Sequence, residues 1–227
     1  MSAFFVTGTD TDAGKTLVTL ALMQVLQDQG LSVNGFKPVA AGIDENGLNP
    51  DALLLQAKSS NELAYQQVNP YLFEPAIAPH IAAAHVEQEI NLAKINKAFI
   101  EVKSSADVVL VEGAGGWLVP INNRQDVADI ALENDLPVIL VVGLKLGCIN
   151  HARLTTESIQ AKGGRLVGWV GSLIDRQMIN IEENIQTLKQ YIMADCLGVI
   201  PFLEKADDKK AASYIDVDKL RQLPGLD

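Results

Sequence analysis

The sequence predicts an α/β fold in which a doubly wound, mainly parallel sheet is flanked by helices. Short apolar runs rich in β-branched residues alternate with helical stretches along the chain, which is typical of strand–helix–strand units. The strand candidates are apolar throughout, as expected for strands that helices cover on both faces. Ligands of such sheets bind beyond the carboxyl ends of the strands, so we expect the functional residues there.

Six segments have the strand pattern: residues 3–8, 32–40, 107–113, 136–143, 165–174 and 196–202. The spacing of apolar residues predicts helices between most of them, including residues 15–29 and residues 150–162. The stretch from Asn46 to about Ile90 has a weaker pattern and several prolines, so we expect helix and loop near the strand ends there. No repeat or linker divides the chain, and we expect residues 1–227 to form a single domain.

The composition disfavours several classes of partner. The net charge is −10, which disfavours binding to nucleic acid and to anionic membrane surfaces. The longest apolar run, "LPVILVVGLKLG", is interrupted by Lys145 and is too short to span a membrane. The chain opens without a leader pattern, and its two cysteines are far apart in apolar surroundings, so we expect a cytoplasmic protein.

The segment "FFVTGTDTDAGKT" joins the first predicted strand to a helix. The usual phosphate-binding loop has four residues between its two glycines, whereas five separate Gly8 from Gly14, and Thr9 stands at the first glycine position. The strand–loop–helix context still predicts a nucleotide site like that of P-loop NTPases. Backbone N–H groups and the helix N-terminus attract phosphate, Lys15 adds a cation, and Thr16 offers a hydroxyl to a metal. An ordinary strand-to-helix turn is the less favoured interpretation.

Two carboxylates are candidates for a metal ion beside this loop. Glu112 closes a predicted strand, and the glycines that follow it allow a ligand to approach the backbone closely. A glycine-rich turn with a solvated Glu112 is the alternative. Asp51 follows Pro50, where an aspartate is as readily a helix N-cap as a ligand, so its role stays open on the pattern alone.

Lys37 stands inside an apolar strand, directly before Pro38. A lysine there is costly unless its ammonium faces an anion near the strand end. We therefore predict that Lys37 and Lys15 converge on a transferred phosphoryl group, whose developing charge they stabilise. A lysine that reaches solvent from an edge strand is the alternative.

Six segments together resemble the dethiobiotin synthase family, in order and with similar spacing. They are "VTGTDTDAGKT", "GFKPVAAG", "NPYLFEPAIAPHIAA", "LVEGAGGWLVPI", "LPVILVVGLKLGCINHARLT" and "GVIPFL", and they extend from Ala3 to about Leu203. The long phosphate loop is this family's own variant. The resemblance implies an ATP-dependent ligase that closes a cyclic urea from 7,8-diaminononanoate and CO₂, with Mg²⁺, in biotin synthesis. A carbamate and a carbamic-phosphoric anhydride are the implied intermediates.

The resemblance also implies roles for individual residues. Lys15 and Lys37 are the implied catalytic residues, and Thr16, Asp51 and Glu112 the implied metal ligands. The implied nucleotide contacts, besides those ligands, are Asp12, Ala13, Gly14, Lys15, Leu17, Gly113, Ala114, Gly115, Ser172, Leu173, Pro201, Phe202 and Leu203. The implied diamine contacts are Lys37, Ala41, Gly147, Cys148, Ile149 and Asn150, of which the last four come from the other subunit of a homodimer.

Two positions depart from the family pattern. Ala41 stands where many members carry a serine near the diamine, and Ser172 stands where members commonly carry an asparagine that contacts the adenine edge.

Two other function classes also remain open: a partitioning-type ATPase switch, and a nucleotide-binding regulator without chemistry. The acidic charge, Lys37 and the segment "KLGCINH" speak against the ATPase.

Overall fold

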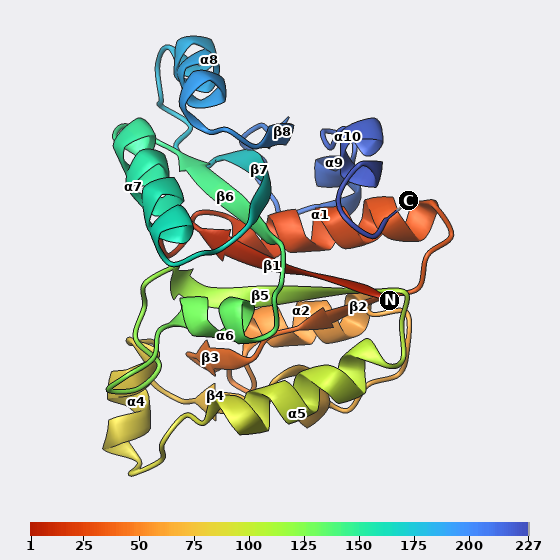
Figure 1. The fold of residues 1–227 in the computed structure, drawn as a ribbon, viewed down its shortest axis with the longest axis vertical. Helices are drawn as coiled ribbons and strands as arrows, with labels where there is room; N and C mark the ends of the chain where they lie inside the picture. The colour runs from red at the N-terminus through yellow and green to blue at the C-terminus, as the bar shows by residue number, and fades with distance from the viewer. Residues whose placement is uncertain (227) are drawn as a thin grey trace.

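The computed structural model describes residues 1–226 and contains a six-stranded sheet in the order β2-β5-β1-β6-β7-β8 (Figure 1). All its strand pairs are parallel. The strands are β1 (Ser2–Gly8), β2 (Val33–Phe36), β5 (Val108–Gly116), β6 (Val138–Leu144), β7 (Leu166–Leu173) and β8 (Asp195–Ile200). The predicted fold class is confirmed.

Helices cover both faces of this sheet. On one face lie α1 (Lys15–Asp28), α2 (Pro50–Lys58), α9 (Asp208–Ala212) and α10 (Val217–Arg221). On the other lie α5 (Leu92–Lys103), α6 (Val127–Glu133), α7 (Cys148–Ala161) and α8 (Ile181–Tyr191). The short helices α3 (Tyr65–Val68) and α4 (Pro79–His85) flank a second, two-stranded sheet. Among residues 1–226, no helix has the length and apolar content needed to cross a membrane.

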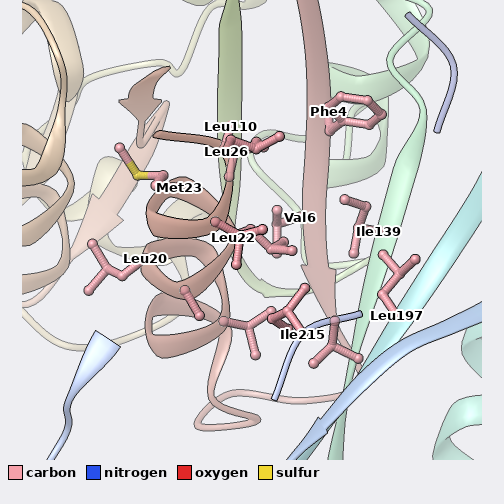
Figure 2. Close-up of a cluster of buried hydrophobic side chains, with 14 of the residues drawn as sticks. Phe4, Val6, Leu20, Leu22, Met23, Leu26, Leu110, Ile139, Leu197 and Ile215 are labelled. Atoms are coloured by element: carbon pink, nitrogen blue, oxygen red, sulfur yellow. The ribbon is translucent and has the colours of Figure 1, made fainter. Parts of the chain in front are cut away.

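Alternate residues of β1 point into opposite cores. Phe4 and Val6 pack with Leu22 and Met23 of α1 in one core, which Figure 2 shows. Phe5 belongs to the core on the other face. Because both faces are buried, β1 is apolar at every position from Ala3 to Val6, as the sequence predicted.

The predicted strand 32–40 is wrong as one continuous element. It breaks after Phe36, and β3 (Val39–Ala41) leaves the main sheet to pair with β4 (Tyr71–Phe73). The Lys37 N–H donates to the Val68 carbonyl over 2.8 Å instead of to a strand of the main sheet, and Pro38 has no N–H to donate. The region 46–90, expected to hold only helix and loop, therefore contributes one strand.

This topology gathers the functional segments at one edge. β1 lies between β5 and β6, so the loops after these three strands emerge side by side at their carboxyl ends. The order of the strands along the chain also reverses here, because the chain builds β2 and β5 on one side of β1 and then β6 to β8 on the other. Such a reversal is where doubly wound sheets bind ligands.

Substitution of two isoleucines on α5 tests the packing of the core beneath the carboxyl edge of the sheet. Ile95 is fully buried, and Ile100 on the same helix is 62% exposed. We expect Ile95→Ala to lower the free energy of unfolding by about 2–5 kcal/mol, because it leaves a cavity among packed side chains. The matched control Ile100→Ala is expected to change it by less than about 0.5 kcal/mol. Urea unfolding followed by circular dichroism measures both, and equal losses would contradict the packing of α5.

Candidate active site

A cavity of about 810 Å³ lies at the carboxyl ends of β1 and β5, facing β3. Its lining contains many of the predicted site residues: Asp12, Gly14, Lys15, Thr16, Leu17, Lys37, Ala41, Asp51, Ala114 and Gly115. These residues come from four separate parts of the sequence, and the strand ends bring them together. The cavity is large enough for a nucleotide or a comparable small molecule.

The phosphate loop, residues 8–14, connects β1 to α1 and begins beside β6. The Thr9 N–H donates to the Val141 carbonyl over 3.0 Å. Gly14 has a left-handed backbone with φ of 89°, and a Cβ atom there would lie only 2.4 Å from the Ser172 hydroxyl. Because no side chain caps α1, the first N–H groups of the helix are available to an anion.

Lys15 is held by the loop that precedes it. Its Nζ donates to the Asp10 carbonyl over 3.0 Å, and the residue is only 7% exposed. Burial, together with the positive charge of Lys37, lowers the pKa of Lys15. Two neighbouring buried cations favour a negatively charged ligand in this cavity.

Lys37 contacts both candidate carboxylates. Its Nζ lies 2.5 Å from Glu112 Oε1 and 3.1 Å from Asp51 Oδ2. Burial alone would lower the pKa of Lys37, but the Glu112 and Asp51 carboxylates outweigh it and raise the pKa. Lys37 does not reach solvent from an edge strand, because its side chain is 5% exposed, so that alternative is wrong.

Asp51 is not a helix cap. Asn49 caps α2 by accepting from the Ala52 N–H, and Asp51 in the first turn faces the cavity. Burial favours the neutral form of Asp51, but the Lys37 ammonium, aided by the Thr16 hydroxyl, lowers its pKa. The Asp51 carboxylate is thus held in its charged form beside Lys37 and Thr16.

Thr16, Asp51 and Glu112 form an oxygen-rich group that fits Mg²⁺. The Thr16 hydroxyl donates to Glu112 Oε1 over 3.0 Å, and Glu112 is fully buried, which excludes the solvated alternative. Glu112 Oε2 has no hydrogen-bond partner among the described residues, and a cation would satisfy it. No group of three or more His, Cys, Asp or Glu side chains suited to a metal occurs in residues 1–226. Phosphate and water oxygens would therefore complete the ligand set, as is usual for Mg²⁺.

The residues expected on the adenine side lie apart from the lining of this cavity. Ser172 is 3% exposed and packs against Gly14, and Leu173 follows it at the end of β7. Pro201, Phe202 and Leu203 follow the end of β8, and Phe202 is 38% exposed. Both segments lie at the carboxyl edge of the sheet, on the far side of β6 from β5.

Three of the four residues expected to hold the distal end of the diamine line a second cavity, of about 530 Å³. Gly147, Ile149 and Asn150 line it at the start of α7, together with Leu146, Arg153, Leu154, Glu157 and Asn184. Cys148 points the other way and is buried in the core between α7 and α8. Burial raises the pKa of the Cys148 thiol, so this cysteine has no activated thiolate.

Several residues that line the first cavity were not among the predicted site residues. Asn49, Ala76, Ile77, Ala78, Pro79 and Val119 also line it. The segment 76–79 reaches the cavity because β3 pairs with β4, and Gly42 N–H donates to the Phe73 carbonyl over 2.9 Å. The prolines of this segment were the feature of the sequence that could have indicated a loop near the site.

Solved structures share the fold at low sequence identity. The MinC:MinD cell division protein complex of Aquifex aeolicus aligns with a TM-score of 0.59 at 18% identity, covering 99% of this chain and 96% of that chain. A ParA family ATPase of Chlorobium tepidum aligns with a TM-score of 0.55 at 14% identity, covering 99% and 93%. At such identities these similarities establish the fold and nothing further.

Sequence relatives are much more similar. An ATP-dependent dethiobiotin synthetase BioD of Cellvibrio japonicus is 50% identical over 96% of this chain and 97% of its own. The proteins of that name in Pseudomonas aeruginosa and Aromatoleum aromaticum are 47% and 46% identical, each over at least 97% of this chain and 98% of their own. A family model described as an AAA domain matches residues 2–210. At this identity and coverage, the chain belongs to the family of ATP-dependent dethiobiotin synthetases.

Proposed function

We propose that this protein closes the cyclic urea of dethiobiotin from 7,8-diaminononanoate and CO₂ at the expense of ATP, in biotin synthesis in the cytoplasm. The observation that carries the proposal is Lys37, a buried ammonium in the same cavity as the phosphate loop. The names of relatives at 44–50% identity support it. A phosphoryl transfer asks the protein mainly for positioning and charge stabilisation, which this cavity is built to supply.

The reaction begins with one amine of the diamine attacking CO₂ and losing a proton, which gives a carbamate anion. A carbamate oxygen then attacks the γ-phosphorus of ATP, and ADP leaves. The second amine attacks the carbamate carbon of the resulting anhydride, and phosphate leaves with closure of the ring. Two anions must meet in the second step, so cations at the meeting point lower its barrier.

The residues divide this work between them. The loop amides and Lys15 bind the phosphates, and Lys37 faces the carbamate and the transferred phosphoryl group. Thr16, Asp51 and Glu112 would hold Mg²⁺, which neutralises phosphate charge when bound. The apolar wall formed by Ala40, Ala41 and the segment 76–79 suits the alkyl chain of the diamine.

We further propose a homodimer with a shared substrate site. The start of α7 offers N–H groups without a side-chain cap, which suit the distal carboxylate of the diamine. Leu146 is 94% exposed and Leu154 is 59% exposed at the second cavity. Burial of these apolar side chains against a second copy would stabilise the dimer.

A turnover assay separates this proposal from its alternatives. Phosphate release that requires both the diamine and bicarbonate supports the synthetase. Release without them would identify an ATPase switch, and nucleotide binding without release would identify a silent regulator.

Replacing Lys37 tests its part in the phosphoryl transfer. We expect Lys37→Ala to lower kcat by about 10² to 10³, as for the loss of one preorganised charge-stabilising donor. ATP affinity, measured by calorimetry on the same sample, should change much less and also shows that the loop is folded. The matched control is Lys58→Ala, which removes a lysine paired with Asp208 outside the cavity lining. Turnover near the control value would remove Lys37 from the mechanism.

Mixing two inactive variants tests the shared site. Lys15→Ala disables the phosphate loop, and Asn150→Trp fills the second cavity. In an equal mixture half of the dimers are mixed, and one of their two sites is intact, so about a quarter of the wild-type activity should return. Absence of activity, after exchange of subunits has been demonstrated by co-purification, would mean that one chain builds the whole site.

Ser172→Asn tests the expected contact with the base. An asparagine amide donates and accepts at once, whereas a serine hydroxyl has a single donor. One added neutral hydrogen bond contributes about 1 kcal/mol, so we expect roughly a fivefold gain in preference for ATP. The measurement is kcat/KM for ATP, GTP and CTP, with the exposed Ser104→Asn as control. An unchanged preference would assign Ser172 only to packing against Gly14.

A further inference from the structure

An ion pair joins the phosphate loop to the segment that leads into α7. Lys145 Nζ lies 2.9 Å from Asp10 Oδ2, and the two side chains are 34% and 46% exposed. Asp10 belongs to the loop between β1 and α1, whereas Lys145 is the first residue after β6. Neither side chain has a role in the function proposed above.

Asp10 connects three groups at once. Its Oδ1 accepts from the Thr11 N–H over 2.8 Å, its Oδ2 accepts from Lys145, and its main-chain carbonyl accepts from Lys15 Nζ over 3.0 Å. The side chain thus fixes the first turn of the loop, and the carbonyl orients the phosphate-binding lysine. A side-chain change at Asp10 would therefore act on Lys15 through the position of the Asp10 carbonyl.

Lys145 is itself fixed at both ends. Its carbonyl accepts from the Cys148 N–H over 3.0 Å at the start of α7, and the residue before it ends β6. Its side chain therefore extends from a well-anchored backbone toward the loop.

The charge of Asp10 gives this ion pair an effect on the binding of phosphate. A carboxylate in a loop that binds phosphate repels its ligand unless a cation neutralises it. The Lys145 ammonium is the group that does so, and its hydrogen bond is the main reason that the pKa of Asp10 is lowered. Loss of Lys145 would leave an unpaired negative charge on the phosphate loop and would release the Asp10 side chain.

We propose that Lys145 and Asp10 are positioning residues for nucleotide binding. Lys145 acts through Asp10: it neutralises the carboxylate and fixes the loop turn from which the Asp10 carbonyl orients Lys15. The pair also ties the loop to the start of α7, which lines the second cavity.

The test is a double-mutant cycle on the binding of ADP and of a nonhydrolysable ATP analogue, measured by calorimetry without diamine. We expect Lys145→Gln to weaken binding about fivefold to tenfold. Adding Asp10→Asn to the Lys145→Gln variant should restore part of the lost affinity, because it removes the carboxylate charge that Lys145→Gln leaves unpaired. The effects of the two substitutions on the binding free energy should therefore not add. Because the diamine is absent, the result does not depend on the proposed reaction.

The matched control is Lys162→Gln. Lys162 also pairs with a carboxylate over 2.8 Å, that of Asp126, and its side chain is 32% exposed. The unfolding temperatures of Lys145→Gln, Asp10→Asn, the double variant and Lys162→Gln should be similar, because partly exposed ion pairs contribute little to stability. Binding by Lys145→Gln equal to that of the control, or effects of Lys145→Gln and Asp10→Asn that simply add, would overturn the proposal.

Discussion

The buried contact between Lys37 and Glu112 is the constraint around which the site is organised. Each residue is less than 5% exposed, and an unpaired charge of either kind would be expensive there. Sheet register brings them together: β2 and β5 are parallel neighbours in which Phe36, the last residue of β2, pairs with Val111. Lys37, the first residue after β2, therefore lies beside Glu112, the next residue of β5. The same hydrogen-bond register that builds the core therefore places a cation beside a carboxylate at the edge where ligands bind.

The break after Phe36 shapes the cavity that the Lys37 side chain lines. If β2 continued beside β5, Ala40 and Ala41 would be part of the main sheet. Instead the chain turns away at Pro38, and β3 pairs with β4, which brings the segment 76–79 to the cavity wall. The Lys37 N–H bonds to Val68 and Pro38 has no N–H to donate, so neither residue extends the pairing with β5. The departure of the chain at this point gives the site its apolar side.

The features that depend on neighbouring residues could be predicted from the sequence. The buried strands are apolar runs, the phosphate loop is a contiguous motif, and Lys37 is conspicuous because its surroundings are apolar. β4 could not be recognised, because three residues carry little pattern and depend on pairing with β3. The contact between Asp10 and Lys145 spans 135 residues, and only the order of the strands makes those two positions neighbours.

The fold alone does not decide between an ATPase and a ligase, because a ParA family ATPase and a MinD cell division protein share it at 14% and 18% identity. The charge in the cavity is more informative. Hydrolysis uses water, a neutral nucleophile that needs a base or an orienting group. A carbamate, the acceptor in the proposed reaction, is already an anion, and charge repulsion opposes its approach to a phosphate; Lys15 and Lys37, which both line the cavity, would reduce that repulsion. Two buried lysines beside the phosphate loop thus favour an anionic acceptor over water.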